Sequence, residues 1–92
     1  MNQSKYTVTN MTSPKTYNAV PNQYLIHTPE GTYFQSYASI IAHKANDGTI
    51  TLGKDWDYSR TTGKYRSIFL RENTAETRKK LNAGIYKYSE EL

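Results

Sequence analysis

The segment Ser59–Arg66 has the clearest chemical character in the chain, because it holds three Ser or Thr hydroxyls, three cations and a glycine, and no acid. Its Ser and Thr residues are typical helix N-caps, so a helix is expected to begin here. A helix N-terminus offers free N–H groups and a partial positive charge to a phosphate or carboxylate, and nearby Arg or Lys strengthens such binding. The segment predicts either an anion site or a well-capped helix whose cations are simply exposed.

A second group of cations forms the run Arg78-Lys79-Lys80. Residues 54–80 hold eight Lys or Arg and four Asp or Glu, and the whole chain has a formal net charge of +4. A basic C-terminal part indicates a nucleic acid or an acidic host protein as partner, although an ordinary solvated surface has a similar composition. The candidate binding residues are Arg60, Thr61, Thr62, Lys64, Arg66, Arg78, Lys79 and Lys80.

Two aromatic residues, Trp56 and Tyr58, stand just before the basic segment. An exposed aromatic pair at this place could stack on nucleic-acid bases. A lone Trp in a small domain is more often part of the core, because it buries a large apolar area. Both interpretations of Trp56 stay open at this level.

Asp55 and Asp57 flank the tryptophan, and His27 and His43 lie in predicted strands. Two carboxylates with a histidine could hold a divalent ion, so a small metal-dependent enzyme is one alternative. A hard-cation site needs more oxygen ligands than these two side chains supply. The chain has no nucleophile elbow, P-loop or dinucleotide fingerprint. We therefore assign no catalytic residue, no metal site and no cofactor.

The length of 92 residues favours one domain, 1–92, with room for one modest core. The mean hydropathy is low, at -0.84, but the nine tyrosines supply apolar area that can be buried in a core. The chain has no Cys, so disulfides and thiolate metal sites are excluded. It has no apolar run of membrane-spanning length and no apolar signal segment at its N-terminus. We expect a cytoplasmic protein with no membrane partner.

The fold class expected from the pattern is α+β, with a small antiparallel sheet of two hairpins followed by two short helices. Residues 1–22 are expected to be irregular, apart from a possible short strand at residues 6–9. Residues 23–53 are expected to form the two hairpins, and residues 54–92 the basic helical part and the tail. Residues 85–88 are either a last strand or a docked tail.

The first predicted hairpin joins residues 24–28 to residues 32–37 through a three-residue loop that ends at Gly31, which is expected to have a positive φ. This register places Ile26 opposite Phe34. The second hairpin pairs residues 39–44 with residues 49–52.

The first helix is predicted over residues 62–71, and the second begins after Asn73, with Glu76 completing a capping box. Apolar residues of the second hairpin and the first helix should be buried together. The predicted core is Ile40 or Ile41, Ala42, Ile50, Leu52, Ile68 and Phe69.

Residues 36–70 resemble a family of short uncharacterised proteins that are common in bacteriophages and mobile elements. The matching residues are Ser36-Tyr37, Ser39-Ile40-Ile41-Ala42, Gly48, Trp56 or Tyr58, Ser59, Thr61, Thr62, Lys64 and Phe69-Leu70. Tyr65 stands where the family pattern usually has His, which argues against a catalytic role there. The resemblance implies a phage, prophage or plasmid origin, and it implies no activity.

These observations predict a non-enzymatic accessory protein of a phage or mobile element. Its basic C-terminal face would bind nucleic acid or a nucleic-acid-handling protein. The main alternative is an anti-defence inhibitor that blocks a host nuclease by protein–protein contact. The sequence leaves the oligomeric state open.

Overall fold

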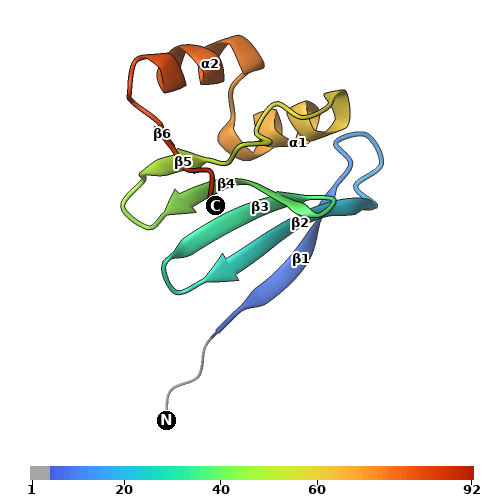
Figure 1. The fold of residues 1–92 in the computed structure, drawn as a ribbon. Coiled ribbons are helices and arrows are strands. Elements are labelled where there is room, and N and C mark those ends of the chain that lie inside the picture. The colour runs from blue at the N-terminus through green and yellow to red at the C-terminus, as the bar shows by residue number, and fades with distance from the viewer. Residues whose placement is uncertain (1–4) are drawn as a thin grey trace.

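The computed structural model describes residues 5–92 as one six-stranded sheet and two helices, an α+β fold (Figure 1). Five strands form an antiparallel meander in chain order, and the sixth pairs in parallel with the fifth. The elements are β1 (Thr7–Thr12), β2 (Ala19–Thr28), β3 (Gly31–Ser36), β4 (Ser39–Ala45), β5 (Ile50–Leu52), α1 (Arg60–Leu70), α2 (Thr74–Asn82) and β6 (Lys87–Tyr88). The sheet is thus larger than the two hairpins that the sequence predicts.

The N-terminal part is more regular than expected, because β1 and the start of β2 fall within residues 5–22. Thr7 lies opposite His27, and Asn10 lies opposite Tyr24. At the other end, residues 87 and 88 add a short strand beside β5.

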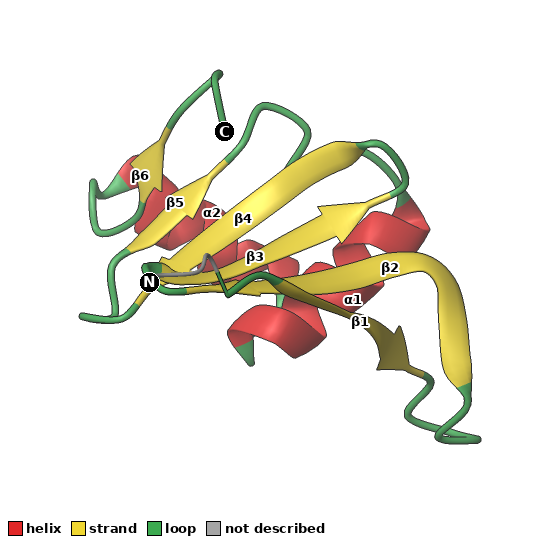
Figure 2. Ribbon diagram, turned by 90° about the horizontal axis from the view of Figure 1, so that it is seen from below, coloured by secondary structure: helices red, strands yellow, loops and turns green. Residues whose placement is uncertain are grey.

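Both helices lie on one face of the sheet. The parallel pairing of β5 and β6 requires a crossover between them, and α1 and α2 form that crossover. Figure 2, seen from below, shows the sheet in front of both helices, so the second face of the sheet carries no helix. We call the side formed by residues 54–82 the helix layer and the second face the open face.

The β2–β3 hairpin has a register that differs by one residue from the predicted one. Thr28 pairs with Gly31, so the loop contains only Pro29 and Glu30. Leu25 therefore lies opposite Phe34, and the prediction that Ile26 opposes Phe34 is wrong. A shift of one residue moves every side chain of a strand to the other face of the sheet.

Gly31 has the predicted positive φ, at 152°, but it belongs to β3 and not to the loop. A Cβ at this position would lie 2.3 Å from the carbonyl oxygen of Lys44 and 2.9 Å from Nε2 of His43. The close approach of β4 therefore explains why glycine stands here.

The core lies between the sheet and α1. Phe34 pairs with Ala42 and Gln35 pairs with Ile40, so Ile41 is an extra residue in β4. This β-bulge lets Ile41 and Ala42 both be fully buried. The buried apolar residues are Met11, Phe34, Ile41, Ala42, Ile50, Leu52, Tyr65 and Leu70. The prediction is confirmed for Ile41, Ala42, Ile50 and Leu52.

The buried stripe of α1 differs from the predicted one. Ile68 is 42% exposed, and Phe69 is only partly buried, with its ring 5.8 Å from that of Phe34. The interior positions are Thr62, Tyr65, Arg66 and Leu70. These residues recur at helical spacing, but two of them are polar, so the apolar pattern alone pointed to the wrong phase.

Helix α2 begins as predicted. The Asn73 side chain accepts a hydrogen bond from the Glu76 backbone N–H, and the Glu76 side chain accepts one from the Asn73 backbone N–H. The helix ends at Asn82, two residues before Gly84, which has a φ of 79°. This capping box fixes where the second half of the helix layer starts.

Candidate nucleic-acid interface

The N-terminus of α1 uses its hydroxyl groups inside the protein. Ser59 is the N-cap, and its Oγ accepts from the Thr62 backbone N–H at 3.2 Å. The Thr62 hydroxyl lies 2.8 Å from Ser36 Oγ and is fully buried. Thr62 therefore faces the sheet, and the expectation that it belongs to a binding surface is wrong. Thr61 is exposed.

Arg66 is the largest fully buried side chain of the protein. Its Nη1 donates to the backbone carbonyl of Trp56 at 2.6 Å and lies 3.5 Å from Asp57 Oδ1. Its Nη2 donates to Thr74 Oγ1. Burial lowers the pKa of the Arg66 guanidinium from its ordinary value, although the nearby Asp57 carboxylate opposes this. The expectation that Arg66 is a surface cation is therefore wrong.

Trp56 lies against two cations instead of projecting as a free platform. It is partly buried against the core, with the Arg66 and Arg78 guanidinium carbons 5.1 and 5.4 Å from its ring centroid. Arg78 also binds Asp57, with Nη2 2.7 Å from Oδ2. Asp57 thus ties the loop before α1 to both helices. Tyr58 is 65% exposed and remains available for stacking.

Glu72, between the two helices, is a second buried charge that the sequence analysis missed. Its side chain is only 5% exposed and accepts hydrogen bonds from Lys80, Tyr86 and Thr77. Burial raises the pKa of this carboxyl, but the three hydrogen bonds outweigh burial and hold it below its ordinary value. The hydrogen bond with Glu72 raises the pKa of Lys80 in turn. The sequence feature that could have indicated this role is the position of Glu72, directly before the N-cap Asn73 of a helix rich in basic residues.

A wide, open hollow lies between the first half of α1 and the start of α2. Its lining residues are Asp57, Ser59, Arg60, Gly63, Lys64, Ser67, Glu72, Asn73 and Thr74. The two carboxylates in this hollow are already paired with Arg66, Arg78 and Lys80. Within residues 5–92, Arg60 and Lys64 have no carboxylate within 4 Å and are exposed. The unpaired charge of the hollow is therefore positive.

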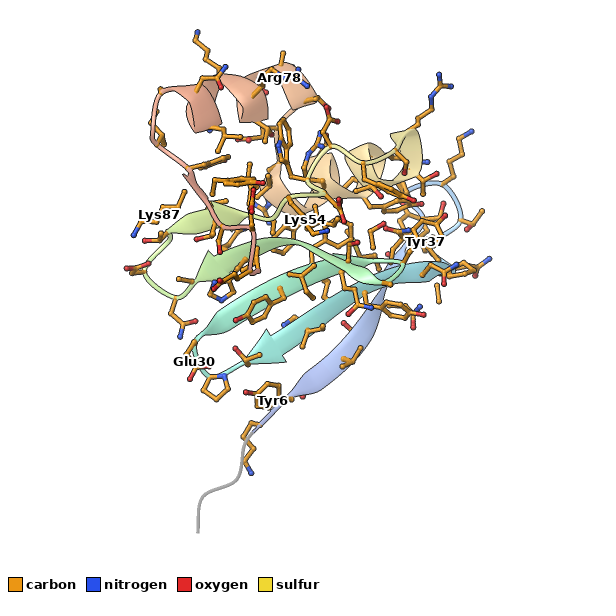
Figure 3. The ribbon with its side chains drawn as sticks, viewed as in Figure 1. Tyr6, Glu30, Tyr37, Lys54, Arg78 and Lys87 are labelled. Carbon is orange, nitrogen blue, oxygen red and sulfur yellow. The ribbon has the colours of Figure 1, made fainter. Side chains whose placement is uncertain are left out.

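The cations of α2 do not all share this hollow. Arg78, labelled on α2 in Figure 3, borders it through its bond to Asp57 and its contact with the Trp56 ring. Lys79 and Lys80 line a separate hollow with Glu76, Ala83 and Ile85. Arg66 is fully buried, so five of the six predicted cations can contribute to a surface, and these five border two different hollows.

The two acids and two histidines that were considered as a possible metal site each have different contacts in the structure. Asp55 accepts a hydrogen bond from Ser39 at 2.7 Å, whereas Asp57 binds two arginines. His43 stacks on Tyr33, with ring centroids 4.2 Å apart, and the Nδ1 of His27 lies 3.4 Å from Thr32 Oγ1. Within residues 5–92, no three His, Cys, Asp or Glu side chains gather closely enough to hold a metal ion.

The fold and these contacts define a small α+β domain with a basic helix layer and an uncovered sheet face. The chain belongs to a family of unknown function, DUF8033, whose model matches residues 6–84. No curated protein and no solved structure matches the chain. Within the part that the structure describes, no helix is long and apolar enough to cross a membrane.

Proposed function

We propose that this protein is a non-enzymatic binding protein whose helix layer engages the phosphate backbone of nucleic acid. The observation that supports this most is the pair Arg60 and Lys64, which are exposed without a carboxylate partner among residues 5–92 at the hollow between the helices. Phosphate contacts from such side chains supply most of sequence-independent affinity. An accessory role in a phage or mobile element, as the resemblance implies, is part of the proposal.

Only some of the binding residues predicted from the sequence belong to the proposed surface around the hollow. Arg60, Thr61 and Lys64 are the exposed residues of this surface at the start of α1, and Tyr58 precedes them in the loop before the helix. Arg78 adds a cation at the border of the hollow. Arg66 and Thr62 support this surface from below, since Gly63 lines the hollow and a Cβ there would lie 3.7 Å from Arg66 Nη2.

The pairing of the two acids makes this place compatible with an anionic partner. A hollow with two free carboxylates would repel phosphate at short range. Here Asp57 is bound by two arginines and Glu72 by Lys80. The remaining charges come from side chains at a helix N-terminus, where the helix dipole adds a positive contribution.

Fluorescence anisotropy with labelled single- and double-stranded DNA and RNA tests the proposal. The double variant Arg60→Glu, Lys64→Glu should weaken binding of all four probes by a similar factor, because phosphate contacts carry no sequence information. The matched control is Lys15→Glu, Lys87→Glu, which changes the net charge equally at exposed positions outside the helix layer.

Absence of binding to every probe at low salt would overturn the nucleic-acid proposal. In that case the same cations would be candidates for contact with an acidic patch on a host protein, as in the inhibitor alternative. Equal loss of binding in the test and control variants would show that only net charge matters, and the assignment to Arg60 and Lys64 would fail.

A further inference from the structure

Two exposed tyrosines, Tyr37 and Tyr58, have rings that make no aromatic or cation contact within the protein. Tyr58 is 65% exposed and Tyr37 is 47% exposed. Among residues 5–92, neither ring stacks on another aromatic ring or lies beneath a cation. The Trp56 ring, in contrast, is already engaged by two guanidinium groups. The two tyrosines therefore offer ring faces to a partner that the tryptophan does not.

The fold brings Tyr37 to the start of α1, although it lies in the turn between β3 and β4. Ser36, at the end of β3, has its hydroxyl 2.8 Å from that of Thr62 in the first turn of α1. Ser39, at the start of β4, donates a hydrogen bond to Asp55 in the loop before α1 at 2.7 Å. The turn is thus fixed on both sides against the segment that contains the second tyrosine. Figure 3 labels Tyr37 at the end of the sheet beneath the start of α1.

The backbone of Tyr37 holds its side chain in a defined place. Its φ is 54°, a left-handed conformation that is uncommon for a bulky residue. The Tyr37 backbone N–H donates to the Asn22 carbonyl oxygen at 2.7 Å, and its carbonyl oxygen accepts from Gln35 Nε2 at 2.7 Å. These hydrogen bonds fix the direction of the ring before any partner binds. A residue of this size therefore stays at a costly position, while about half of it is exposed.

The same segment supplies the unpaired cations Arg60 and Lys64, which lie two and six positions after Tyr58. So few phosphate contacts give only weak affinity, so a second source of binding energy is needed. Stacking of bases on aromatic rings is such a source, and it combines with a positive surface in proteins that bind single strands. In a duplex the base faces are covered by neighbouring base pairs, whereas unpaired bases can stack on a protein ring.

We propose that this end of the molecule binds single-stranded nucleic acid in preference to duplex. Tyr37 and Tyr58 stack on bases, while Arg60 and Lys64 contact phosphates of the same strand. This inference rests on the proposed function and narrows its ligand to single strands. Stacking does not depend on the 2′-hydroxyl, so single-stranded DNA and RNA are both ligands.

Fluorescence anisotropy at low salt tests the preference with three labelled probes of about 12 nucleotides or base pairs, a length typical of single-strand sites. The probes are oligodeoxythymidylate, oligouridylate and a DNA duplex. The wild type should bind both single strands more tightly than the duplex. Tyr37→Asn, Tyr58→Ala should weaken binding of both single strands by about tenfold or more, because each stacked base is lost. Duplex affinity should change by less than about twofold, since no phosphate contact is removed.

Two controls separate stacking from other effects. Tyr37→Phe, Tyr58→Phe keeps both ring faces and should bind single strands like the wild type. Tyr6→Ala, Tyr88→Ala removes tyrosines of matched exposure, 63% and 48%, and should also bind like the wild type. Figure 3 labels Tyr6 at the opposite end of the sheet, and Tyr88 lies on the edge strand β6. Asn suits the left-handed backbone at position 37, so the test variant should remain folded.

Wild-type binding of the duplex as tight as that of the single strands would overturn this inference. Unchanged single-strand affinity in Tyr37→Asn, Tyr58→Ala, together with a loss in Arg60→Glu, Lys64→Glu, would also overturn it and would leave the proposed function standing. An equal loss in the Phe variant or in the Tyr6→Ala, Tyr88→Ala control would show that stacking at these two positions is not the cause. Absence of binding to all three probes would overturn both the inference and the proposed function.

Discussion

Arg66 Nη1 donates a hydrogen bond to the backbone carbonyl of Trp56 at 2.6 Å, which places a fully buried guanidinium beneath the basic surface of the helix layer. The same side chain reaches Thr74 at the start of α2. One buried cation thus holds the loop before α1 and both helices in a fixed arrangement. Arg60 and Lys64 lie where they do because this arrangement fixes the start of α1.

Replacing Arg66 should therefore destabilise the protein far more than replacing an exposed cation. Arg66→Ala removes several buried hydrogen bonds and leaves a cavity, at an expected cost of about 3 kcal/mol in the free energy of unfolding. Lys64→Ala, at an exposed position of the same helix, should cost less than about 0.5 kcal/mol. Urea denaturation measures both. Similar values for the two variants would contradict the buried role of Arg66.

Gly31 should not tolerate even a methyl group. A Cβ there would lie 2.3 Å from the Lys44 carbonyl oxygen, and the φ of 152° adds strain. We expect Gly31→Ala to cost about 2–4 kcal/mol, because both overpacking and backbone strain act. Gly48→Ala is the matched control, since its φ is 93° but no atom lies within 4 Å of the added Cβ. Thermal unfolding should show the smaller loss for Gly48→Ala, and the reverse order would disprove the close approach of β4.

Gln23 is fully buried, and neither its Nε2 nor its Oε1 has a hydrogen-bond partner within the described part of the chain. An unsatisfied buried amide costs about 1–3 kcal/mol, whereas an apolar side chain of similar shape avoids this cost. Gln23→Met should therefore raise the free energy of unfolding by about 1 kcal/mol. A clear loss of stability in urea denaturation would mean that the amide is satisfied in solution.

Stability should fall with acid because of Glu72. Its pKa is held below the ordinary value of 4.5, so the folded state binds the proton less readily than the unfolded state. The resulting stabilisation is complete above the unfolded pKa and is lost as the pH falls through the lower folded pKa. Unfolding free energies measured from neutral to acidic pH should show this loss in the wild type. Glu72→Gln should be less stable at neutral pH and should show a smaller acid-dependent loss.

The sequence predicted the features that depend on local chemistry. Asn73 and Glu76 form the expected capping box, and the alternating Ile50 and Leu52 are buried as expected. The hairpin register was not predictable, because the loop length depends on how closely β4 approaches Gly31. That approach is a contact between residues far apart in the sequence.

The candidate site was predictable only in part, for a similar reason. A cation in a helix is normally read as a surface residue, and nothing near Arg66 in the sequence reveals that Thr74 and the Trp56 carbonyl surround it. Thr62 is buried because Ser36, on a distant strand, supplies its hydrogen-bond partner. Arg60 and Lys64, which lack such partners, are the residues that stay at the surface as expected.

The salt dependence of nucleic-acid affinity tests the central claim most directly. If the helix layer binds phosphates through Arg60 and Lys64, log Kd should change linearly with log salt concentration. The slope for Arg60→Glu, Lys64→Glu should be smaller than that of the wild type by about two units for duplex DNA, which is about one unit for each cation that no longer neutralises a phosphate. The Lys15→Glu, Lys87→Glu control should keep the slope of the wild type. An unchanged slope in the helix-layer variant, or wild-type binding that does not depend on salt, would contradict the account.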